Sequence, residues 1–209
     1  MLSFLTVNTH SSIRIEAEKI IYTDPFRIPD APHDADIILI THSHFDHLSP
    51  EDIRKVAGPD TMLVCPRSVT EADGLGLSVK KVGAKEAFTV CGISMETVPA
   101  YNKLKPFHPK SKGWVGYVIH SKEHGHIYIA GDTDDTAEAR QVQCRIALLP
   151  IGGTFTVDAR QAAVLANAIR PEYVIPIHYG SVAGKPEDAE TFQKLVDSSI
   201  TVVTKVETF

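Results

Sequence analysis

Three histidines and a carboxylate lie within six consecutive positions, in the segment His-Ser-His-Phe-Asp-His that begins at His42. Imidazole and carboxylate groups are ligands that a borderline dication such as Zn²⁺ accepts. An apolar run, residues 37–40, leads into this segment and indicates a buried strand. At its end His42 and His44 project to the same side, and Asp46 and His47 follow where the strand gives way to a loop. The segment therefore predicts a metal site at a strand end, which we favour over a solvated, histidine-rich loop.

Three further polar residues stand where strand-like runs end. Asp24, Asp132 and His178 each follow directly after a run of mostly apolar residues. The interior of a strand is used for packing, so chemistry is displayed at its ends and in the loops that follow. These three side chains are therefore candidates to complete the site that begins at His42.

Length and composition limit the classes of protein to consider. The 209 residues suggest one domain with a sizeable core, and 43% of them are hydrophobic. The net charge of −5 gives no electrostatic basis for binding nucleic acid or an anionic membrane. Three isolated cysteines predict neither disulfides nor a cysteine zinc site. No apolar run reaches transmembrane length and no basic leader opens the chain, so we expect a cytoplasmic protein.

The pattern of hydrophobic residues predicts a fold of the α+β class. Alternating runs at 4–8, 12–15 and 19–22 predict an antiparallel meander, and the nearly apolar run 36–41 predicts a strand covered on both faces. Further strands are expected at 61–65, 87–90, 93–98, 114–120, 126–130, 146–149, 173–177 and 201–203. Helices are expected at 50–57, 66–73, 136–142, 158–169 and 186–196, with Ser49 and Thr156 as N-caps of the first and fourth. Two sheets with outer helices fit this order better than a Rossmann sheet does.

The order of the chemical residues resembles the metallo-β-lactamase superfamily, and the resemblance covers nearly the whole chain as a single domain, residues 1–209. It rests on an early aspartate, the signature H-x-H-x-D-H, a later aspartate and a late histidine: Asp24, His42 to His47, Asp132 and His178. The resemblance implies a four-layer αββα sandwich with two metal ions at one edge of its sheets. Local details are similar to the compact branch that includes sugar-phosphate lactonases and other metal-dependent hydrolases.

The resemblance also divides the ligands between two ions that share one bridging carboxylate, that of Asp132. Zinc is the expected metal for both ions, with manganese or iron as alternatives. The two sets are His42 with His44 for the first ion, and Asp46, His47 and His178 for the second.

Four positions keep alternatives open. The family supplies a third histidine to the first metal, but Asn102 stands where that residue is expected, and His108 is the nearest histidine. We favour His108 as a site residue, either as a ligand or facing the substrate, while Asn102 could offer a carbonyl oxygen. Asp24 either orients a ligand or is a turn residue before a proline. His10 either faces the site, as in the compact branch, or lies on the surface.

The chemistry that such a site implies is hydrolysis. A dimetal centre lowers the pKa of bound water from about 15.7 towards 7 and so supplies hydroxide at neutral pH. The hydroxide would attack an ester, lactone or phosphoester bond while Asp46 accepts or shuttles the proton. No separate serine or cysteine nucleophile is needed, and no G-x-S-x-G motif is present.

The loop around His108 carries four lysines within ten residues, which suggests a small anionic substrate; an ordinary solvated loop is the alternative. They are Lys103, Lys105, Lys110 and Lys112. A phosphodiesterase or nuclease is a second hypothesis, although no basic surface supports it. A metal-binding or sensing protein without turnover is the third, motivated by the missing third histidine. A homo-oligomer stays open.

Residues outside this set receive structural interpretations. His33, His120, His124 and His126 lack ligand-like spacing with the main cluster, and the last two are expected at the surface of a hairpin. Trp114 is expected in the core, with a place in the pocket as the alternative. Gly152 and its neighbour do not match a phosphate loop and could instead let backbone approach the site closely.

Overall fold

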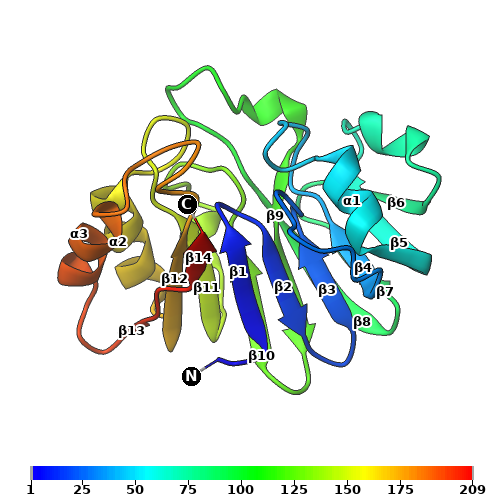
Figure 1. The fold of residues 1–209 in the computed structure, drawn as a ribbon. Helices are drawn as coiled ribbons and strands as arrows, with labels where there is room; N and C mark the ends of the chain where they lie inside the picture. The colour runs from blue at the N-terminus through cyan, green and yellow to red at the C-terminus, as the bar shows by residue number, and fades with distance from the viewer. Residues whose placement is uncertain (1, 209) are drawn as a thin grey trace.

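The computed structural model describes residues 2–208, which form two seven-stranded sheets that face each other between outer helices (Figure 1). The first sheet has the order β14 (Val206–Thr208), β1 (Leu5–Thr9), β2 (Ile13–Glu16), β3 (Ile20–Thr23), β4 (Ala35–Leu39), β5 (Ala57–Pro66) and β6 (Ser78–Val82). The second has the order β13 (Thr201–Val202), β12 (Tyr173–Ile177), β11 (Ile146–Pro150), β10 (Gly125–Ile129), β9 (Val115–Ser121), β8 (Ile93–Pro99) and β7 (Ala87–Val90).

Three apolar clusters separate the four layers. The largest lies between the sheets and receives the inward side chains of both. A second lies between the second sheet and the helices α2 (Ala159–Ile169) and α3 (Asp188–Leu195), and a third lies beneath α1 (Pro50–Val56) on the first sheet. Figure 1 shows α2 and α3 together on one side of the molecule and α1 on the other. The predicted α+β class and αββα sandwich are confirmed.

The first strands form as their residue pattern predicts. β1, β2 and β3 pair antiparallel, as expected of the alternating runs, and β4 then adds parallel to β3. All of β4 except Asp36 is buried, because the second sheet covers the inner side of this strand and α1 covers its outer side. This strand ends at Leu39, immediately before the segment that carries the histidines.

Both predicted helix caps can be compared with the structure. Ser49 caps α1, since its hydroxyl accepts a hydrogen bond from the backbone N–H of Asp52. The prediction of Thr156 as N-cap is wrong, because the N-cap of α2 is Asp158, two residues later. Asp158 accepts from the N–H of Gln161, whose side chain accepts in return from the N–H of Asp158. This reciprocal capping box satisfies two donors that a lone threonine would leave unpaired.

Other differences concern short segments. The helices expected at 66–73 and 136–142 are only single 3₁₀ turns, η1 (Glu71–Gly74) and η3 (Ala139–Gln141); a third such turn is η2 (Lys110–Lys112). Segments this short gain too little from helix propagation to offset nucleation. Two strands were not predicted: β6, an edge strand containing two lysines, and β14, which pairs with β1 from the opposite end of the chain. Within residues 2–208, no helix is long and apolar enough to cross a membrane.

A buried tyrosine connects the two sheets beside the segment that carries the histidines. The hydroxyl of Tyr117 on β9 donates a hydrogen bond of 2.8 Å to the carbonyl oxygen of Ile40, just after β4. Tyr128 on β10 is equally buried, but its hydroxyl has no hydrogen-bond partner among the described residues. The two tyrosines therefore offer a matched pair for measuring what this connection contributes.

We predict opposite outcomes for removing the two hydroxyls. Tyr117→Phe leaves a buried carbonyl without its donor and should lower the free energy of unfolding by roughly 1–3 kcal/mol. Tyr128→Phe removes a buried hydroxyl that satisfies nothing, so it should leave stability unchanged or raise it. Urea unfolding of both variants measures the difference. Equal losses of stability in the two variants would show that the Tyr117 bond contributes nothing specific.

Candidate metal centre

A first group of three imidazoles gathers where β4 and β8 end. His42, His44 and His108 each place one ring nitrogen within 4.8 Å of the other two. His42 and His108 are buried, and His44 is partly exposed. Trp114 packs against all three rings, with ring centroids 4.9 Å from those of His42 and His44. This tryptophan belongs to the core beneath α1, as expected, and it also forms one wall of the histidine group.

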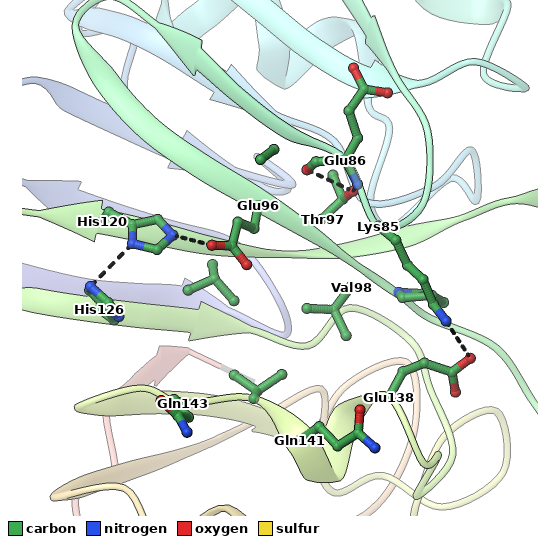
Figure 2. A pocket seen from close by; sticks show the side chains of 14 residues that line it. Lys85, Glu86, Glu96, Thr97, Val98, His120, His126, Glu138, Gln141 and Gln143 are labelled. Atoms are coloured by element: carbon green, nitrogen blue, oxygen red, sulfur yellow. Dashed lines mark hydrogen bonds and ion pairs between the residues drawn. The ribbon is translucent and has the colours of Figure 1, made fainter.

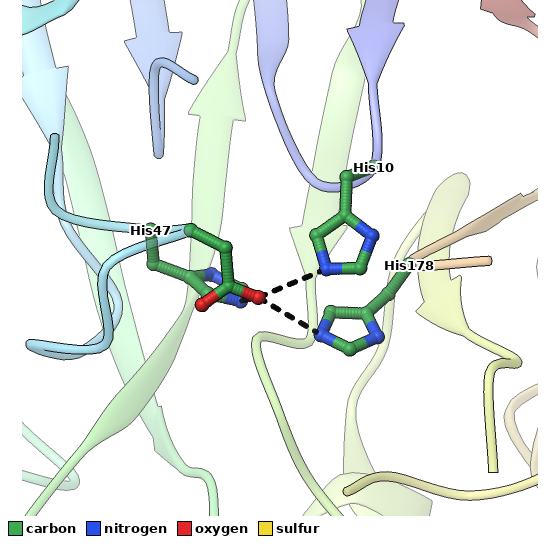
Figure 3. Close-up of side chains that lie close together, drawn as sticks. His10, His47 and His178 are labelled. Carbon is green, nitrogen blue, oxygen red and sulfur yellow. Dashed lines mark hydrogen bonds and ion pairs between the residues drawn. The ribbon is translucent and has the colours of Figure 1, made fainter. Parts of the chain in front are cut away.

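A second group lies beside the first and is fully buried. It contains His10, Asp46, His47 and His178, whose candidate ligand atoms also lie within 4.8 Å of one another. Oδ2 of Asp46 lies 3.1 Å from His10 Nε2, 3.8 Å from His47 Nε2 and 3.9 Å from His178 Nε2. Figure 3 shows these three histidines close together. His10 has no exposed surface, so the alternative that it is a surface histidine is wrong.

The carboxylate of Asp132 lies between the two groups. Its Oδ2 is 3.3 Å from Nε2 of His108 in the first group and 3.0 Å from Nε2 of His178 in the second. Its Oδ1 is 3.3 Å from Nε2 of His47, and Oδ2 is 4.0 Å from Nε2 of His42. One carboxylate therefore approaches histidines of both groups, which is the position expected of a residue that bridges two ions.

Asp24 supports the second group from behind. It is buried, and its Oδ2 lies 2.7 Å from Nδ1 of His47. The same carboxylate accepts hydrogen bonds from the N–H and the hydroxyl of Thr41 at 2.8 and 2.6 Å. Asp24 is therefore more than a turn residue, because it fixes the His47 ring so that Nε2 faces Asp132. Thr41 was not predicted; its position directly before the histidines was the only signal in the sequence.

Asn102 performs the same task for the first group. Its Oδ1 accepts from the backbone N–H of His108 at 3.1 Å and lies 3.0 Å from Nδ1 of the same histidine. Its amide nitrogen donates to Asp134 and to the carbonyl of Phe155. The oxygen that could have met a cation is thus committed to His108, which leaves His108 Nε2 directed at Asp132.

Charge within the cluster follows from burial and from the carboxylates. Burial lowers the pKa of His42 well below its usual value, with a further contribution from His47. Burial also lowers the pKa of His44. Burial opposes the ionisation of Asp132, but His178 and His47 hold its pKa well below the usual range. The neutral imidazoles of His42 and His44 beside the ionised Asp132 present lone pairs and negative charge, which are what a dication requires of its ligands.

Several candidate ligand atoms are buried without a hydrogen-bond partner among the described residues. They are Nε2 of His47, His108 and His178, and Oδ1 of Asp132. Their close contacts with one another are not aligned as hydrogen bonds, although buried polar atoms are nearly always paired. A cation among these atoms would satisfy all four, so the donor set fits metal ions.

Comparisons with known proteins agree with this geometry. A family model described as "Beta-lactamase superfamily domain" matches residues 4–178. The chain belongs to this superfamily. A UPF0173 metal-dependent hydrolase of Methanopyrus kandleri is 31% identical over 90% of this chain and 89% of its own length, so the chain also belongs to the UPF0173 family.

Two solved structures share the fold of this chain. A protein of Parabacteroides distasonis, described as a metal-dependent hydrolase, is 31% identical with a TM-score of 0.82, over 96% of this chain and 91% of that one. The metallo hydrolase Igni18 of Ignicoccus hospitalis is 24% identical with a TM-score of 0.77, over 97% and 94% of the two chains, and shows the fold alone.

Backbone geometry in this UPF0173 protein brings the second group together. His10 and His178 both have positive φ angles, 52° and 56°, and the N–H of His178 donates to the carbonyl of His10 at 2.9 Å. Such angles are uncommon outside glycine and cluster at functional sites. Gly152 lies against His178, where a Cβ atom would be 2.2 Å from the His178 carbonyl oxygen. The predicted close approach of backbone at Gly152 is therefore confirmed.

Two of the four lysines in the loop around His108 form ion pairs within the protein and are not free to attract a substrate. Lys105 pairs with Asp134 at 2.7 Å, and Lys110 pairs with Glu138 at 2.9 Å. Lys103 and Lys112 are exposed and have no ion pair among the described residues. Only two of the four ammonium groups therefore remain available to a ligand.

We predict that Gly152→Ala displaces His178. The added methyl group would overlap the His178 carbonyl, so the metal bound by the second group should be held roughly 10- to 100-fold more weakly. Stability should fall by about 1–3 kcal/mol. Gly74→Ala is the control, since a Cβ there meets nothing within 4 Å. Metal content after dialysis against a graded chelator series measures the effect, and equal retention by both variants would contradict it.

Proposed function

We propose that this protein is a hydrolase with two zinc ions, for which manganese or iron are alternatives. The observation that carries the proposal is the buried carboxylate of Asp132 between two histidine groups. Nε2 of His47, His108 and His178 has no hydrogen-bond partner within residues 2–208. The relatives named metal-dependent hydrolases support it. A cytoplasmic location belongs to the same proposal.

Each group would hold one ion. Asp132 would bridge the ions, as its contacts with His108 and His178 suggest. We assign no metal to Asn102, since its oxygen already serves His108. The ligand sets proposed are His42, His44 and His108 for the first ion, and Asp46, His47 and His178 for the second.

The ions would lower the pKa of water and polarise the bond to be cleaved. The protein contributes a fixed proton acceptor and a dry environment. Burial raises the pKa of Asp46, but the hydrogen bond from His10 and the nearby His47 outweigh burial and lower it to about 2. Asp46 is thus ionised at neutral pH and held in place by His10 at 3.1 Å, where it would accept or shuttle a proton during hydrolysis. His108 would line the reacting region beside it.

The proposed substrate is a small anionic ester, lactone or phosphoester. The exposed lysines Lys103 and Lys112 lie on the loop that carries His108, and they support attraction of an anion. A nuclease activity gains no support, because the chain has a net charge of −5. The hypothesis of a sensor without turnover depended on a missing third histidine, and His108 in the first group removes that reason.

Two variants distinguish a ligand from a residue that orients it. His108→Ala should remove one ion per chain and abolish hydrolysis, because it deletes a proposed ligand. Asn102→Ala should keep both ions at saturation but weaken one of them roughly 10- to 100-fold, because only the orientation of His108 is lost. Elemental analysis and chelator titration measure both quantities. The assignment is wrong if Asn102→Ala loses an ion that His108→Ala retains.

Substrate charge can be tested with the exposed lysines. In the double variant Lys103→Ala/Lys112→Ala we expect KM for phosphorylated or carboxylated lactones and esters to rise several-fold, with kcat nearly constant. The loss should diminish at high salt, which screens such attraction. Lys122→Ala, in a hairpin outside the candidate centre, is the control. An unchanged KM for every anionic substrate that is turned over would rule out this attraction.

A further inference from the structure

A second histidine cluster lies on the outer face of the second sheet, away from the candidate centre. His120 on β9 is directly opposite His126 on β10, and on its other side it is opposite Ser94 on β8. Glu96 is two residues beyond Ser94, so it projects from the same face as both histidines. The neighbouring inward residues Met95 and Ile119 fill the core between the sheets, which confirms that the cluster faces outward.

These three side chains are already in contact. Nδ1 of His120 lies 3.1 Å from Nε2 of His126, and Nε2 of His120 lies 3.2 Å from Oε1 of Glu96. If Nε2 of His120 carries the proton, it donates to the carboxylate and leaves Nδ1 with a free lone pair facing His126. Figure 2 shows this series of contacts running from Glu96 through His120 to His126.

The cluster borders an open cavity of about 510 Å³ between the sheet and η3. Its far side is formed by the segment from Gln141 to Gln143 and by the Lys85–Glu138 ion pair. Glu96 and His126 are exposed and His120 is partly exposed, so ions and small molecules can reach the imidazole nitrogens from solvent. Much of the rest of this face is apolar and packs in the cluster that includes α2, so this end is a polar and accessible part of it.

We propose that His120 and His126 bind a transition-metal ion between Nδ1 of the first and Nε2 of the second, with Glu96 orienting His120. Two imidazole nitrogens on one tetrahedral ion are about 3.3–3.4 Å apart when each metal–nitrogen bond is about 2.0–2.1 Å. The observed 3.1 Å needs to widen only slightly. A carboxylate that accepts from the second nitrogen of a ligating histidine is a common support of metal sites. Water would fill the remaining positions, and Cu²⁺, Ni²⁺ and Zn²⁺ suit such ligands.

The site is separate from the proposed catalytic centre and does not depend on the proposed function. His126 precedes Asp132 by six residues along β10 and the residues after it, which corresponds to about 20 Å of extended chain. Figure 2 and Figure 3 accordingly show no residue in common.

The test uses the whole protein with its main centre loaded with zinc and the excess removed. One equivalent of Cu²⁺ is added, zinc content is measured before and after, and the electron paramagnetic resonance spectrum is recorded. We expect one Cu²⁺ per chain, coupled to two imidazole nitrogens, with zinc content unchanged. His126→Ala and His120→Ala should each remove one nitrogen coupling and most of the affinity. Glu96→Gln should keep both couplings while weakening binding roughly 10- to 100-fold.

Controls separate this site from general binding by surface histidines. His33→Ala removes another exposed histidine, far from the cluster in the sequence, and should leave copper affinity and spectrum unchanged. Circular dichroism establishes that each variant is folded. Copper that enters only in exchange for zinc would overturn the proposal. So would a wild-type spectrum with a single nitrogen, or equal binding by wild type and His126→Ala.

Discussion

The burial of Asp132 among imidazoles is the constraint to which the rest of the centre responds. An ionised carboxylate inside a protein is strongly unfavourable unless it is paired, and a buried nitrogen without a partner adds a further, smaller penalty. The centre contains both a buried carboxylate and buried nitrogens without partners. The facing atoms of Asp132, His47, His108 and His178 approach closely but form no hydrogen bonds to one another. Neighbouring charges raise the pKa of His47 to about 10 despite its burial, mainly through Asp132 and then Asp24. A proton there compensates part of the negative charge, and dications would compensate it more completely.

The sandwich fold makes this concentration of charge feasible. The proposed ligands come from loops that follow different strands. The apolar layers therefore provide the stability of the domain, while the loops carry the groups whose burial is unfavourable. Within the centre, His47, His108 and His178 are each held at the second ring nitrogen or at the backbone. Asp24 holds His47, Asn102 holds His108, and His10 contacts both Asp46 and the backbone of His178. The geometry is therefore set before any ion binds, which reduces the reorganisation that binding requires.

The sequence was informative wherever local spacing determines geometry. The segment from His42 to His47 follows a buried strand, as predicted. Asp132 and His178 could be predicted as site residues because each comes soon after the end of a strand, β10 or β12, and strand ends are local features of the sequence. The positions of His10 and His108 depend on contacts between residues far apart in the chain, so the sequence alone left them undecided. The same reason explains β14, which pairs with β1, some 200 positions earlier. Likewise, the pairing of His120 with His126 depends on strand register, which spacing within one segment does not reveal.

Asp134 explains how a histidine six positions beyond Asn102 can still reach the first group. Its carboxylate accepts hydrogen bonds from the Asn102 side chain, the Lys103 backbone and the Lys105 ammonium group, at 3.1, 2.9 and 2.7 Å. Since Asp134 is two residues after Asp132, the loop that supplies His108 is anchored to the segment that supplies the shared carboxylate. Any shift of one would move the other, which keeps Nε2 of His108 aligned with Asp132. Lys105, which seemed suited to attracting substrate, instead helps to maintain this alignment through its contact with Asp134. The place of the third histidine in the first group is therefore determined by the contacts of Asp134 and not by its distance from Asn102 along the sequence.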